Sequence, residues 1–232
     1  MVPFLVEILK FHQHRAHGTS LVAVVFTGMA GAATYALHGS VDLTASAVLA
    51  VTAIATAHFG ARIAGSLPEW KLKRSFGIFL VVAAVLLFAK PYLPLLRMDA
   101  PGMWSKLSLL LVSGMLAGLL SGIMGGGGGI VMVPVLVLVL GFDQHLAQGT
   151  SLLVMVPAAG VGAWTHNRLG NVETRLLFWM VPGLFLGTFV GASIAHLLNE
   201  GRLREVFAMV LIWIGIRYLM APSPVRSPAA GS

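Results

Sequence analysis

The acidic residues of this chain lie between its long apolar runs, and this placement constrains the fold more than any other feature. Seven of the eight Asp and Glu residues interrupt no apolar run, and only Glu7 falls inside one. Soluble domains carry about 25% charged residues, whereas this chain of 232 residues is 57% hydrophobic and 10% charged. Lipid must cover so much apolar surface, so the sequence predicts an all-α integral membrane protein.

Spanning a bilayer takes a helix of about 20 mostly apolar residues. Two apolar runs, Val2–Leu9 and Ile130–Leu140, have only about half that length and are more typical of re-entrant segments or half-helices than of full spans. Residues 221–232 are rich in Pro, Ser, Ala and Gly and are expected to form a disordered tail. We expect seven full spans, near Thr19–Leu37, Leu43–Leu67, Ser75–Phe88, Leu107–Met124, Thr150–Trp164, Leu176–Leu198 and Val206–Met220.

The chain matches itself when it is shifted by 131 positions, without gaps from Met1 to Phe76. We therefore expect two homologous helical repeats within one membrane domain, residues 1–97 and 104–220. The first repeat, as given, begins after the leading helix and glycine loop with which the second begins; either that element lies upstream of Met1 or this chain dispenses with it. If the half-length segment crosses the membrane the repeats are inverted, and if it re-enters they are parallel. Inverted repeats are common in secondary transporters, so we favour that arrangement.

A run of five glycines, 125–129, stands between a long apolar helix and a short one. Glycine lets successive backbone N–H groups point into one concavity, and the N-terminus of the following helix adds partial positive charge. The alternative is a flexible turn or a close helix crossing. We interpret the run as an anion site formed by Gly126, Gly127, Gly128 and Gly129.

Each repeat also carries a Gly-Thr-Ser sequence that opens a span. The hydroxyl and N–H groups there could bind oxyanion oxygens, or they could cap the helix. His58 and Arg62 lie four apart on one helix face, where an intramembrane cation suggests function unless Arg62 reaches the interface. The candidate binding residues are Gly18, Thr19, Ser20, Gly149, Thr150 and Ser151, with Gln148, His17, His58 and Arg62 as further candidates.

Several other kinds of function are not supported. The chain has no cysteine and no motif of a hydrolase, zinc protease or P-loop, so we expect no enzyme. His12, His14 and His17 lack nearby carboxylate or thiolate ligands, so we expect no metal or cofactor. The net charge of +7 is scattered over short loops, where it meets lipid head groups and not nucleic acid.

Three segments together carry a family resemblance: residues 118–129 with the glycine run, Val133–Leu136, and Ala147–Leu152. They resemble the TauE/SafE family of sulfite exporters. Residues 191–195 and 203–207 in the second repeat, and 60–64 and 72–76 in the first, are also similar to that family. The resemblance implies export of sulfite, sulfoacetate or a related organosulfonate by a multi-pass protein of the bacterial inner membrane.

The residues and the resemblance both indicate a negatively charged substrate. A cation carrier would hold Asp or Glu within its spans, and here only Glu7 qualifies. We therefore predict a secondary transporter that moves a small sulfur-containing oxyanion by alternating access. A passive anion channel and a non-transporting membrane scaffold remain alternatives. Small residues on the helices also make a homodimer plausible.

Overall fold

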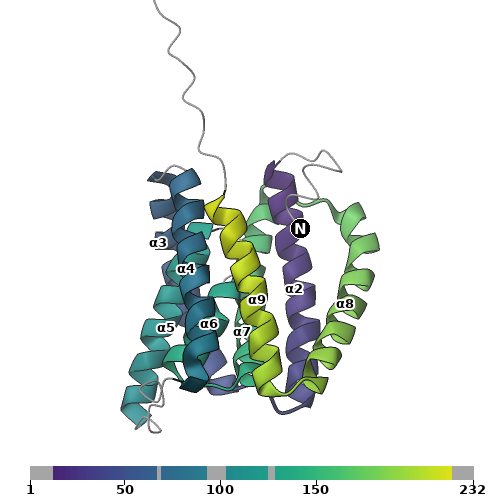
Figure 1. The fold of residues 1–232 in the computed structure, drawn as a ribbon. Helices are drawn as coiled ribbons and strands as arrows, with labels where there is room; N and C mark the ends of the chain where they lie inside the picture. Colours follow the sequence, from purple (N-terminus) through teal and green to yellow (C-terminus); the bar gives the residue numbers. More distant parts are fainter. Residues whose placement is uncertain (1–12, 67–68, 93–102, 125–128, 221–232) are drawn as a thin grey trace, which may run out of the picture.

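The computed structural model describes residues 13–66, 69–92, 103–124 and 129–220, and every regular element within them is helical (Figure 1). The predicted half-length segment Val2–Leu9 and the predicted tail lie outside these residues. The elements are α2 (Gln13–Leu37), α3 (Leu43–Ser66), α4 (Glu69–Ala89), the 3-10 turn η1 (Lys90–Tyr92), α5 (Met103–Met124), α6 (Gly129–Val139), α7 (Gln144–Arg168), α8 (Thr174–Leu197) and α9 (Glu200–Leu219).

The helices stand side by side in pairs around the short helix α6 (Figure 1). Helix α3 packs against α5, α4 against α9, and α2 against both α7 and α8. Helix α6 contacts α4, α5 and α7. Its Leu136 is fully buried, as are Leu49 of α3 and Leu80 of α4. The core therefore surrounds the half-length helix.

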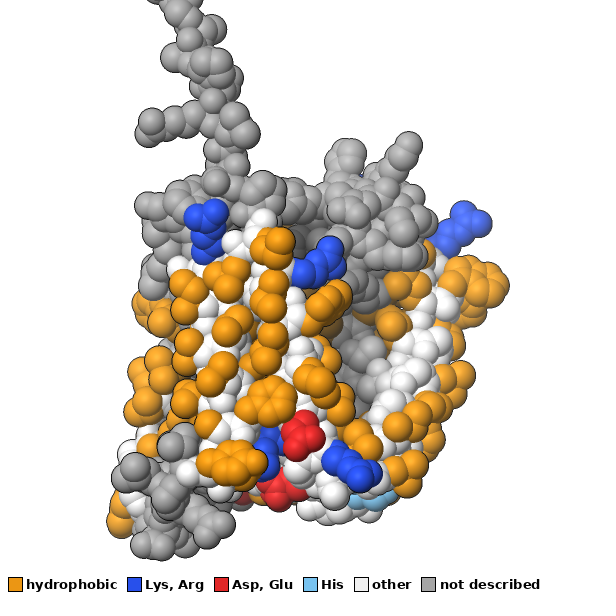
Figure 2. All heavy atoms as spheres, in the orientation of Figure 1, with side chains coloured by type: hydrophobic (Ala, Val, Ile, Leu, Met, Phe, Trp, Pro, Cys, Tyr) orange, Lys and Arg blue, Asp and Glu red, His pale blue; other side chains and the backbone are white. Residues whose placement is uncertain are grey.

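The outer surface fits a bilayer. Figure 2 shows hydrophobic side chains over the middle of one face, with Lys and Arg towards both ends. Three shorter helices, Leu43–Ala57, Leu107–Leu119 and Gly129–Val139, are also apolar. The expectation of an all-helical membrane protein is confirmed, whereas the count of seven spans stays a prediction. Among the described residues, four helices are long and apolar enough to cross a membrane: Gly18–Leu37, Arg74–Tyr92, Gln144–Arg168 and Thr174–Leu197.

Helix ends follow local signals in the sequence. The Asp143 side chain accepts a hydrogen bond from the Leu146 N–H and so caps the start of α7. Gly39 and Gly170 follow the ends of α2 and α7, and both have φ of 70°. This left-handed conformation favours glycine. The two glycines are 131 positions apart, so the chain turns alike at matching points.

Candidate functional site

Helices α2 and α7 cross with a reciprocal pair of hydrogen bonds. The Asp42 N–H donates to Thr150 Oγ1 at 3.1 Å, and the Glu173 N–H donates to Thr19 Oγ1 at 3.0 Å. Both threonines are buried. Each threonine lies near the start of its own helix and binds a residue just beyond the end of the other. The two helices therefore run antiparallel.

The glycines before these threonines allow the close approach. A Cβ atom on Gly149 would lie 2.1 Å from the Ser40 carbonyl oxygen, and one on Gly18 would lie 2.2 Å from that of Asn171. Backbone carbonyls cannot move aside cheaply, so a side chain at either position would force the helices apart. Gly18, Thr19, Gly149 and Thr150 thus hold the crossing of α2 and α7.

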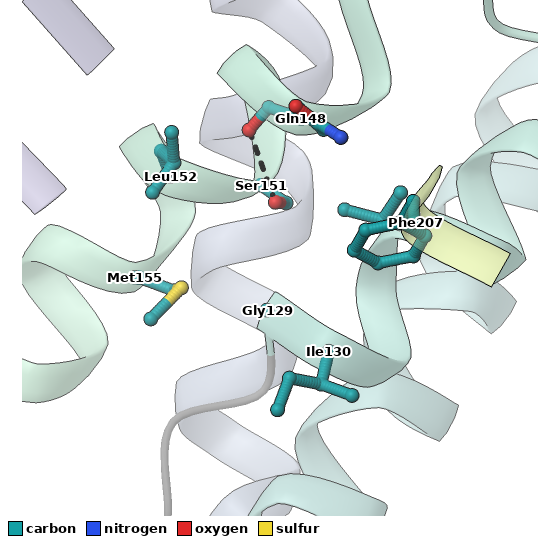
Figure 3. A pocket seen from close by; sticks show the side chains of 8 residues that line it. Gly129, Ile130, Gln148, Ser151, Leu152, Met155 and Phe207 are labelled. Atoms are coloured by element: carbon teal, nitrogen blue, oxygen red, sulfur yellow. Dashed lines mark hydrogen bonds between the residues drawn. The ribbon is translucent and has the colours of Figure 1, made fainter. Parts of the chain in front are cut away.

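A cavity of about 390 Å³ opens between α6, α7 and α9 (Figure 3). Helix α6 begins at this cavity, with Gly129 and Ile130 on its wall. Val133 of α6 also lines it, and the other lining side chains come from one face of α7 and from Phe207 of α9. The lining residues are Gly129, Ile130, Val133, Gln148, Ser151, Leu152, Met155 and Phe207.

Polar groups enter this mostly apolar cavity from α7. The Tyr35 hydroxyl of α2 donates to Gln148 Oε1, which leaves the two N–H groups of the Gln148 amide as donors. The Ser151 hydroxyl donates to the Gln148 carbonyl oxygen at 3.1 Å (dashed in Figure 3). None of the lining residues is acidic. The described part of the cavity wall therefore offers hydrogen-bond donors and no negative charge.

The start of α6 adds to this donor character. The first N–H groups of a helix have no acceptor within the helix, and they carry partial positive charge. Helix α6 is only 11 residues long and begins at the cavity wall with Gly129. A half-helix whose N-terminus faces a cavity within a membrane protein is a recurrent way to hold an anion.

The structure divides the predicted binding residues into three groups. Gly129, Gln148 and Ser151 line the cavity. The glycines and threonines of the two Gly-Thr-Ser sequences lie at the helix crossing, and Ser20 is half-buried on α2 outside the cavity lining. The remaining candidates are not tested: Gly126, Gly127 and Gly128 lie outside the described residues, as do the side chains of His17, His58 and Arg62.

Sequence reasoning did not identify Tyr35, Met155 or Phe207 as part of the site. A signal for Tyr35 was present, because residue 166 at the matching position of the second repeat is His, another polar ring within a span. Met155 and Phe207 gave no signal, since apolar side chains that line a cavity look like any others in an apolar helix.

Comparisons with known proteins indicate a family of membrane transporters. The family described as "Sulfite exporter TauE/SafE" matches residues 1–218. The probable membrane transporter protein YdhB of Bacillus subtilis is 28% identical, over 91% of this chain and 87% of its own length. A probable membrane transporter protein of Xylella fastidiosa strain Temecula1 is 34% identical, over 88% of this chain and 78% of its own length. No solved structure matches the chain.

Proposed function

The chain belongs to the sulfite exporter TauE/SafE family of membrane transporters, and on that premise we propose that it is a secondary transporter exporting a small sulfur-containing oxyanion. Sulfite, sulfoacetate and related organosulfonates are the substrates that the family name and the donor chemistry of the cavity favour. We place it in the bacterial inner (plasma) membrane, since these two relatives are probable membrane transporter proteins of the bacteria Bacillus subtilis and Xylella fastidiosa.

One observation carries the proposal: the half-helix α6 begins at a cavity where the Gln148 amide presents donor N–H groups and where none of the described lining residues is a carboxylate. Oxyanion oxygens are strong acceptors, and hydrogen bonds to charged groups are stronger than those between neutral groups. The apolar part of the wall, with Leu152, Met155 and Phe207, suits an anion with a small organic portion. A cation would find no compensating charge there.

Alternating access requires two halves that can rock against each other, and inverted repeats provide them. Several features support this arrangement. Helices α2 and α7 match each other in sequence and run antiparallel, and Thr19 and Thr150 make the same hydrogen bond to opposite halves. The pair α4 and α9 also match under the shift and pack together. A two-fold axis that exchanges the two repeats would pass between α2 and α7 and between α4 and α9.

The site can be tested by removing its donors one at a time. Gln148→Leu should lower uptake of labelled sulfite into proteoliposomes roughly tenfold or more, because a hydrogen bond to a charged group is lost. Ser151→Ala should have a smaller effect, since that hydroxyl already donates to a backbone carbonyl. The thermal stability of each variant in detergent shows whether the fold is kept.

Ser193→Ala is the matched control. The Ser193 hydroxyl donates to the Phe189 carbonyl oxygen within α8, as Ser151 does within α7, but it lies outside the cavity. Uptake by this variant should equal that of the wild type. If Gln148→Leu also transported normally, the cavity would not be the binding site.

The two alternatives predict other results. A passive channel would conduct without saturation and would show single-channel currents. A membrane scaffold would transport no anion at all, and Gln148→Leu would leave its scaffolding role unchanged.

A further inference from the structure

Four ring side chains meet at one end of the bundle, where α2 and α8 end and α7 begins. The ring centroid of His196 lies 4.0 Å from that of His38 and 5.2 Å from that of His145. The Tyr35 ring lies 4.4 Å from His196. We call His38, His145 and His196 the histidine cluster. The proposed transport site uses none of them.

Each imidazole has one nitrogen free to take up a proton. A carbonyl oxygen only accepts, so the ring nitrogen beside it carries hydrogen, and the other nitrogen is then an acceptor. The Nε2 atom of His196 is buried and has no hydrogen-bond partner within the described residues. The contacts that fix the rings are His38 Nδ1 at 2.8 Å from the Thr34 oxygen, His196 Nδ1 at 2.9 Å from the Ala192 oxygen and His145 Nε2 at 3.2 Å from the Ala195 oxygen.

Three described carboxylates at this end of the bundle make contacts at the starts of helices. Asp42 Oδ1 accepts from the Ala45 N–H at the start of α3, and Asp143 Oδ1 accepts from the Leu146 N–H at the start of α7. Glu200 pairs with Arg204 within α9. The other charged side chains here, among the described residues, are Lys90, whose ammonium donates to the Phe142 carbonyl oxygen, Arg202 and Glu205.

A short path joins the cluster to the cavity. Tyr35 contacts the ring of His196 on one side and donates its hydroxyl hydrogen to Gln148 Oε1 on the other. Gln148 is a donor on the cavity wall. Positive charge on the cluster therefore acts on a bound anion across one buried tyrosine, where screening is weaker than in water.

We propose that the histidine cluster is a proton-binding site linked to the anion cavity through Tyr35 and Gln148, so that proton and anion bind cooperatively. This rests on the proposed function of the cavity. Linkage is reciprocal: a bound anion favours the charged cluster, and the charged cluster favours the anion. Histidine takes up its proton as the pH falls through about 8 to about 5. The affinity for the anion should therefore rise towards acid pH.

Uptake into proteoliposomes at equal internal and external pH tests this linkage. Labelled sulfoacetate and thiosulfate serve as probes because their charges stay constant over this pH range, and labelled sulfite is measured alongside. The wild type should show a KM at least about fivefold lower at pH of about 5.5 than at about 8, the lower end of typical coupling between sites. His196→Asn should remove most of this difference.

Two further variants keep the test decisive. His38→Asn changes an exposed side chain, so it should fold even if His196→Asn does not, and it should weaken the pH response. His166→Asn is the matched control, because His166 also has a buried unpartnered nitrogen but lies at the far end of α7. Its pH response should equal that of the wild type.

The outcomes separate this inference from the proposed function. Saturable uptake with a KM that does not change with pH, or an unchanged pH response in both cluster variants, would overturn the linkage and leave the anion site standing. If the wild type took up none of the three anions, the proposed function would fail and the linkage with it.

Discussion

At the scale of single residues, Thr19 and Thr150 show that the role of a side chain depends on its partner in the opposite repeat. The self-match of the sequence identified both as candidate anion donors or helix caps. In the structure each accepts a backbone N–H from the opposite half, 154 and 108 positions away in the chain. No local pattern contains such a partner, so the matching positions could be predicted from the sequence but this contact could not.

Gly149→Ala should destabilise the protein strongly, because the new Cβ would lie 2.1 Å from the Ser40 carbonyl oxygen. Gly160→Ala, in the same helix, is the control: its Cβ would meet nothing within 4 Å, and alanine favours helix by about 1 kcal/mol. Thermal unfolding in detergent compares the two. Equal midpoints would mean that the helices do not approach each other so closely.

Thr150→Val keeps the shape of the side chain but leaves the Asp42 N–H without its acceptor. We expect a loss of about 1–3 kcal/mol in unfolding free energy, while Thr150→Ser should restore most of it. Thr27→Val is the matched control, because the Thr27 hydroxyl only donates to the Val24 carbonyl oxygen of its own helix. Chemical unfolding of the three variants measures the differences, and a neutral Thr150→Val would contradict the reciprocal bond.

At the scale of elements, α6 is where prediction and structure meet most closely. The short apolar run at Ile130–Leu140 predicted a half-helix, and α6 spans Gly129–Val139. Its length was readable because the run is too short to cross a bilayer. The neighbours of α6 could not be predicted, because the helix is apolar on all sides. Nothing in its sequence indicates which of its faces packs near Met155 or Phe207.

Gly129→Ala should reduce transport with little loss of stability. The new Cβ would lie 2.3 Å from the Met155 sulfur, and that flexible side chain can move, but only by crowding the start of α6 and the cavity. Adding Met155→Ala should recover part of the uptake of labelled sulfite. Wild-type uptake by the single variant would remove the start of α6 from the site.

At the scale of the whole molecule, the two halves differ in what covers them. Thr52 and Thr56 of α3 fit against glycines of α5, and the Thr56 hydroxyl donates to the Met115 carbonyl oxygen at 3.0 Å. The position in α8 that matches Thr56 is Gly187, where a Cβ would meet nothing within 4 Å. Helix α8 is also the least buried of the four candidate spans. The sequence predicted the repeats but not that this face of α8 has no neighbour among the described residues, which appears only once the contacts of each helix are known.

The homodimer expected from the small residues should therefore form through α8. The chain has no cysteine, so Gly187→Cys introduces a single thiol, and oxidation in membranes should crosslink two copies. Val112→Cys, on an exposed face of α5, is the control and should give little crosslinking. Equal crosslinking at both positions would indicate random collisions between copies and would contradict a dimer that forms through α8.

Uptake of radiolabelled sulfite by the wild-type protein in proteoliposomes tests the central claim most directly, with sulfoacetate, thiosulfate, sulfate and chloride as competitors. We predict saturable uptake that one or more sulfur oxyanions suppress and chloride does not. The absence of uptake of every anion, from protein shown to be folded and inserted, would contradict the account.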